Sequence, residues 1–108
     1  MSGAVVLSTA PTAEEAAALA RSLVEEGLAA CVNLVPGARS IYRWEGKLCD
    51  DAEHLLVIKT SASRRDELLA RLPQLHSYDC PEAIALPIEA GAPAYLRWLE
   101  EQTAESTS

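Results

Sequence analysis

The stretch AACVNLVPGARSIYRWEGKL, residues 29–48, decides the fold. Residues 29–35 combine small and apolar side chains with a single amide, which predicts a strand that is at least partly buried on both faces. Proline cannot donate a ladder hydrogen bond and glycine permits positive φ, so Pro36 and Gly37 predict a bulge or bend within a strand. Residues 40–44 again have the composition of a β-strand. The following Glu-Gly-Lys triplet predicts a hairpin turn, with a partner strand at residues 53–60.

The length of this hairpin arm predicts an oligomer. Residues 29–44, when extended, span on the order of 50 Å at roughly 3.3 Å per residue, whereas a domain of this size has a radius of gyration of about 13 Å. The far end of the arm is therefore expected to project beyond its own subunit. Because a two-stranded ribbon is marginally stable alone, we expect Tyr42 and Trp44 to pack at an interface between subunits. The alternative is that the arm folds back over its own sheet at Pro36 and Gly37.

Composition limits the classes of protein to consider. The 108 residues are 49% hydrophobic, which predicts one globular domain over residues 1–108. A formal net charge of -7 disfavours binding to nucleic acid or to an anionic membrane. The apolar runs are too short to cross a bilayer, so we expect no membrane insertion. Three widely spaced cysteines favour a reducing, cytoplasmic location over a disulfide framework.

Strand and helix signals alternate around the hairpin. A β-branched run at residues 4–8 predicts a buried strand, and Thr12 with Glu15 forms a capping box that begins a helix. A second helix is expected to end at Pro73, before a half-buried strand at residues 83–89 and a last short helix. The order β-α-β-β-α-β predicts an α+β, ferredoxin-like sandwich with a long β-hairpin arm and a C-terminal helix. Its helices should cover one face of the sheet, and neighbouring subunits the other.

Four segments together resemble a known family. The hairpin stretch, with LLVIKT, LHSYDCPEAIALPI and YLRWL further along, is similar to the CutA divalent-cation tolerance proteins over residues 5–99. The resemblance implies a ferredoxin-like homotrimer with arms packed between subunits, and an architecture like that of the PII signalling trimers. It also implies a role in tolerance of copper and other divalent metals. No catalytic motif is present, so we expect no enzyme and no catalytic residues.

The resemblance also implies a place for metal. Some family members carry a cysteine at the end of the first strand and a His-His pair in the loop after the second helix, together proposed as a copper site. Here Ser8 and Leu75 replace two of those ligands, which leaves His76 as the candidate metal ligand. Cys80 in the same loop is a further candidate, because copper binds thiolate and imidazole. We therefore expect copper or another divalent metal ion to bind weakly, unless Cys80 is only a packing residue.

Two other functions use different residues. If clefts between subunits gather Arg43 and Lys59 with Tyr78 and Glu82, the trimer would bind a small anionic ligand, as the PII likeness suggests. The basic residues could instead form ion pairs across the trimer. A third hypothesis is a small enzyme centred on the loop at residues 78–82, where a phenol and a carboxylate offer an acid and a base.

Overall fold

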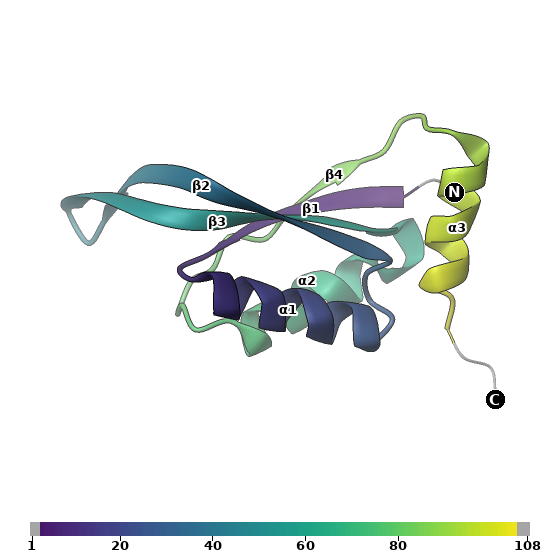
Figure 1. The fold of residues 1–108 in the computed structure, drawn as a ribbon, viewed down its shortest axis with the longest axis horizontal. Coiled ribbons are helices and arrows are strands. Elements are labelled where there is room, and N and C mark those ends of the chain that lie inside the picture. The colour runs from purple at the N-terminus through teal and green to yellow at the C-terminus, as the bar shows by residue number, and fades with distance from the viewer. Residues whose placement is uncertain (1–2, 106–108) are drawn as a thin grey trace.

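The computed structural model describes residues 3–105 and has the predicted order of elements. The elements are β1 (Gly3–Ala10), α1 (Ala13–Glu25), β2 (Cys31–Trp44), β3 (Lys47–Ser61), a 3-10 turn (Ala62–Arg64), α2 (Arg65–Leu75), β4 (Ile84–Pro87) and α3 (Pro93–Gln102). The strands form one antiparallel sheet in the order β2-β3-β1-β4. Helices α1 and α2 cover one face, and α3 stands at the end away from the arm (Figure 1). The ferredoxin-like prediction is confirmed.

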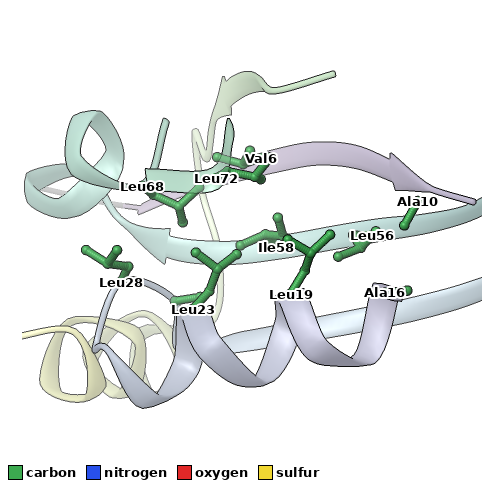
Figure 2. Close-up of a cluster of buried hydrophobic side chains, with 11 residues drawn as sticks. Val6, Ala10, Ala16, Leu19, Leu23, Leu28, Leu56, Ile58, Leu68 and Leu72 are labelled. Carbon is green, nitrogen blue, oxygen red and sulfur yellow. The ribbon is translucent and has the colours of Figure 1, made fainter. Parts of the chain in front are cut away.

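The core lies between the sheet and the two helices on its face. Leu19 and Leu23 of α1 point toward Ile58 of β3 (Figure 2), and α2 adds Leu68 and Leu72. All five side chains are buried. Burying a leucine or isoleucine side chain contributes about 1.5–3 kcal/mol, so this layer is the main source of stability.

The start of α1 agrees with the prediction from sequence, but the end of α2 does not. The Thr12 hydroxyl accepts a hydrogen bond from the Glu15 N–H at 3.1 Å, as the capping box predicts. The expectation that α2 ends at Pro73 is wrong, because the helix continues to Leu75. Proline removes its own N–H and crowds the carbonyl group four residues earlier, but Leu75 packs against the core because the helix continues.

β2 and β3 form the long arm, which extends beyond α1 (Figure 1). The longest dimension of the molecule is 46 Å and its radius of gyration is 14.5 Å. The turn consists of Glu45 and Gly46, both with positive φ (49° and 80°), the geometry that suits twisted hairpin strands. β3 therefore begins directly at Lys47, so the expected start at residue 53 is too late. Asp50 and Asp51 pair with β2 and do not form a loop.

Pro36 and Gly37 form the predicted bulge. The ladder pairs Val35 with Leu55 and then Ala38 with Glu53, so two residues of β2 lie opposite one residue of β3. Because side chains alternate between the faces of a strand, one extra residue exchanges the two faces of β2. Odd-numbered residues of β2 pair with odd-numbered residues of β3 before the bulge. After the bulge, even-numbered residues of β2 pair with odd-numbered residues of β3.

The face of the sheet opposite α1 and α2 is largely apolar, although the register also places Lys59 and Asn33 on it. The register places these side chains on it: Val5, Leu7, Leu55, Val57, Ile84 and Leu86. Ile84 and Leu86 are 52% and 49% exposed in the single chain. Exposed apolar side chains of this kind are typical of a protein–protein interface.

Candidate functional site

A cleft of about 680 Å³ lies between the arm and the loop that follows α2. The arm lines it with Ser40, Ile41, Tyr42 and Trp44. The bulge explains this wall: it places Ser40, Tyr42 and Trp44 on the face that also carries Glu53.

The other wall is the loop between α2 and β4. It contributes Ser77, Tyr78, Asp79, Cys80 and Glu82, and Thr9 and Glu53 complete the lining. The titratable side chains around the cleft are thus carboxylates, phenols and a thiol. No lysine or arginine of the described chain lines it. The cleft therefore favours a positively charged ligand over an anion.

His76 is buried and fixes the start of this loop. Its Nε2 lies 2.7 Å from the carbonyl oxygen of Thr9, and its Nδ1 accepts a hydrogen bond from the Tyr78 N–H at 3.1 Å. A carbonyl oxygen only accepts hydrogen bonds, so the Nε2–H donates to Thr9. Both ring nitrogens are thus bound to backbone groups, and His76 holds the loop against the end of β1.

Glu15 holds the same loop from α1. Its carboxylate accepts hydrogen bonds from the Ser77 N–H at 3.0 Å and the Ser77 hydroxyl at 2.7 Å. Burial acts to raise the pKa of Glu15, but these two hydrogen bonds outweigh burial and lower that pKa. The loop is therefore anchored to both the sheet and the first helix.

A buried carboxylate and a phenol meet within the cleft. The Tyr78 hydroxyl donates to Glu53 Oε2 at 2.8 Å, and Glu53 is only 6% exposed. Burial, the hydrogen bond to Glu53 and neighbouring negative charges raise the pKa of Tyr78 to about 12. On the arm, the Tyr42 hydroxyl donates to Asp51, and that hydrogen bond is the main reason why the pKa of Tyr42 is also raised. Both phenols remain protonated donors at neutral pH.

The structure brings together some of the predicted site residues. Tyr78, Glu82 and Cys80 all line the cleft, opposite Tyr42 and Trp44, which were predicted for the subunit interface. His76 does not line the cleft but supports it through Tyr78.

The two predicted basic residues lie elsewhere in the single chain. Arg43 is on β2 beside the hairpin turn, where it pairs with Leu48. The Lys59 ammonium donates to the side chain of Asn33 and lies 3.8 Å from Cys31 Sγ. Neither residue reaches Tyr78 or Glu82, so one chain does not form the predicted anion site.

The side chains of one chain do not fit a preformed copper site. Within residues 3–105, no three His, Cys, Asp or Glu side chains are close enough together to hold a metal ion. Ser8 is fully buried and its hydroxyl has no hydrogen-bond partner among residues 3–105, while the side chain of Leu75 offers no ligand atom. A hydroxyl is a poor substitute for a thiolate as a copper ligand.

Sequence reasoning missed Glu53 and Asp79 as site residues. The signal for Glu53 was one acidic residue directly before the apolar run HLLVI, in a strand that otherwise enters the core. Its position opposite Ala38 depends on the bulge, which shifts the register of the arm. Asp79 had no distinguishing pattern.

No helix among residues 3–105 is long and apolar enough to cross a membrane. One relative, from Oryza sativa, is named as a chloroplastic protein, and one solved structure, from Archaeoglobus fulgidus, is named as a periplasmic protein. Similarity to these proteins therefore does not define a compartment, and the cytoplasmic location stays a prediction.

Comparison with known proteins identifies close relatives. The family model described as CutA1 divalent ion tolerance protein matches residues 4–102. The chain is 52% identical to the divalent-cation tolerance protein CutA of Thermus thermophilus, over 92% of this chain and 96% of that protein. It is also 52% identical to the chloroplastic protein CutA 1 of Oryza sativa, over 94% of this chain, but it spans only 58% of the length of that relative.

Solved structures agree with these matches. The crystal structure of CutA1 from Oryza sativa superposes with a TM-score of 0.93 at 50% identity, covering 98% of this chain and 97% of that one. CutA from Xylella fastidiosa gives a TM-score of 0.92 at 42% identity, with 95% and 99% covered. The fold and the sequence therefore point to the same relatives.

Proposed function

Since the chain belongs to the CutA1 divalent ion tolerance protein family, we propose that it contributes to tolerance of divalent cations, copper included, as a homotrimer that binds metal ions weakly. The observation that carries this proposal is the lining of the cleft. It combines Glu53, Asp79 and Glu82 with the Cys80 thiol, and no basic residue of the described chain joins them. Such a surface attracts cations.

The arm and the open face support assembly. β2 is an edge strand of 14 residues, whose outer backbone groups have no partner strand in the sheet that the structure describes. Tyr42 and Trp44 are 40% and 46% exposed on this arm. The apolar face that carries Ile84 and Leu86 also needs a cover. Three copies, rather than two, follow from the resemblance to the family.

Weak binding follows from the ligand set. Asp79, Cys80 and Glu82 are exposed, but a metal held by them would keep part of its water shell. His76 could join only after Nδ1 releases the Tyr78 N–H and turns from the end of β1. We therefore expect Cys80 to contribute more than His76.

A calorimetric titration with copper, under reducing and non-reducing conditions, tests this proposal. Wild type should bind saturably, and Cys80→Ser should weaken binding while Cys49→Ser, a thiol change outside the cleft, should not. His76→Ala should weaken binding only through the loop. Absence of any saturable binding would contradict the proposal, and so would equal weakening by the two cysteine variants.

The two alternative functions lack such support. An anion site would need a second subunit to bring Arg43 or Lys59 to the cleft, since neither lines it in one chain. An enzyme would need an acid or base that titrates near neutral pH. Tyr78, with a pKa of about 12, stays protonated and bound to Glu53. The family is named for ion tolerance and not for a catalytic activity.

A further inference from the structure

Aromatic rings and carboxylates line the same cleft. The rings belong to Tyr42, Trp44 and Tyr78, and the carboxylates to Glu53, Asp79 and Glu82. An inorganic ion gains little from ring faces and needs several oxygen, nitrogen or sulfur ligands at once. An organic cation is attracted by both groups, since ring faces and carboxylates each present negative potential. The aromatic part of the lining therefore suits an organic cation, whereas a metal ion would use only the carboxylates and the thiol.

Glu53 supplies an independent reason to expect a cation. Its side chain is 6% exposed, and the hydroxyl of Tyr78 is its one partner in the described chain. Buried carboxylates are normally paired with a cation, because an unpaired charge in a low-dielectric site is costly. A positive group that enters the cleft would provide the missing pair.

The phenols do not supply that positive charge. The hydroxyl of Tyr42 donates to Asp51 and that of Tyr78 donates to Glu53, so each proton stays on its phenol oxygen. Burial is the largest cause of the raised pKa of Tyr78, and the negative charges of Glu53, Asp51 and Glu15 add to it.

We propose that this cleft binds an organic ammonium or guanidinium group, with Glu53 as its counter-charge and the rings of Tyr42, Trp44 and Tyr78 as its walls. The volume of about 680 Å³ suits a small molecule. Two sources offer this chemistry: a free small amine, or a lysine or arginine side chain of another copy of the chain. The proposal rests on the cleft alone and does not depend on metal binding.

The experiment is a calorimetric titration of the whole assembled protein with 1,4-diaminobutane and tetramethylammonium, beside the neutral 1,4-butanediol. Both cations should bind saturably and the diol should not. Glu53→Gln keeps an acceptor for Tyr78 but removes the charge, and should weaken amine binding about tenfold or more. The control is Glu25→Gln, which makes the same change at an exposed residue outside the cleft and should bind normally.

A second variant guards against misfolding of the first. Trp44→Leu keeps an apolar side chain but removes a ring face, so it should weaken tetramethylammonium binding several-fold, as expected for loss of a cation–π contact. Equal weakening by Glu53→Gln and Glu25→Gln would overturn the proposal, because it would indicate attraction by net charge alone. Binding of the diol as tight as that of the diamine would also overturn it.

Light scattering of the same variants distinguishes the two sources. If free amines do not bind and Glu53→Gln assembles more weakly than Glu25→Gln, the cation comes from another copy. If free amines do not bind and both variants assemble normally, the proposal is overturned. Diamine binding without copper binding would contradict the metal proposal and leave the organic-cation proposal intact. Copper binding, with amine binding and assembly both unaffected by Glu53→Gln, would contradict the organic-cation proposal and leave the metal proposal intact.

Discussion

Buried polar side chains in this chain differ in how well they are satisfied. Both ring nitrogens of His76 are bound to backbone groups, and the Thr60 hydroxyl donates to the Leu28 carbonyl oxygen at 2.7 Å. The hydroxyl of Ser8 is fully buried and has no hydrogen-bond partner in the part of the chain that the structure describes. An unsatisfied buried hydroxyl costs about 1–3 kcal/mol, so Ser8 is a local weakness in the sheet.

Replacing Ser8 should therefore stabilise the protein. We expect Ser8→Ala to raise the free energy of unfolding by up to about 1 kcal/mol, because the unpaired hydroxyl is removed. Thr60→Val, a matched loss of a bonded hydroxyl, should lower it by about 1 kcal/mol. Urea unfolding at one fixed chain concentration measures both. A Ser8→Ala variant as destabilised as Thr60→Val would contradict this account.

The tyrosines give a test based on pH. The pKa of each of the three tyrosines, Tyr42, Tyr78 and Tyr95, is raised above the ordinary value, to about 12 for Tyr78. A raised folded pKa means that the stabilisation is fully present below the unfolded pKa of about 10 and is lost as pH rises through the folded pKa. The ultraviolet absorbance of tyrosinate should thus stay low at pH ~10 in the folded protein and appear normally in guanidinium. A folded tyrosine that titrates normally would contradict this result.

At the scale of elements, the bulge decides which side chains face the cleft. Tyr42 and Trp44 lie on the face of Glu53 only because β2 carries one residue more than β3 at Pro36 and Gly37. The bulge therefore links a two-residue sequence signal to the composition of the site.

Deletion of Pro36 tests this link. Without the extra residue, Tyr42 should point to the opposite face of the arm and lose its hydrogen bond to Asp51. One tyrosine should then titrate closer to pH ~10 than in wild type. Gly37→Asn is the control, since asparagine tolerates the φ of +84° at this position and should preserve the bulge. An unchanged titration after the deletion would show that the bulge does not set the face.

The elements were more predictable than the site. Periodicity and turn residues are local signals, so the order of elements, the capping box at Thr12 and the bulge could be predicted. The start of β3 could not, because Asp50 and Asp51 resemble a polar loop and pair only when β2 lies beside them. Tyr78 and Glu82 were found from their loop. Glu53 was not, since its burial depends on the register of a distant strand.

At the scale of the whole molecule, the single chain leaves a projecting arm and an apolar face of the sheet uncovered. The arm extends one dimension to 46 Å against 29 and 22 Å for the others. The face opposite the helices exposes apolar side chains, including Ile84 and Leu86. Both features are costly in a monomer and useful in an assembly.

Light scattering should give three chains per particle. Trp44→Asp should weaken assembly about tenfold or more, because it places a charge where an aromatic anchor is expected. Arg21→Asp, a charge change on the exposed side of α1, should leave assembly unchanged. A monodisperse wild-type monomer would contradict the trimer, and an intact Trp44→Asp trimer would remove the anchoring role of Trp44.

The order of the strands also has a consequence for biosynthesis. β1 is translated first, but one of its two neighbours is β4, and the ladder joins Ala4 to Pro87. At about 5–20 residues per second, the ribosome needs several seconds between these two residues. During that time the edge of β1 that pairs with β4 has no partner strand. The sheet can therefore be completed only when nearly the whole chain has been synthesised. A nascent chain of this kind is exposed to aggregation while it waits, and chaperones that bind early strands should matter most for its yield.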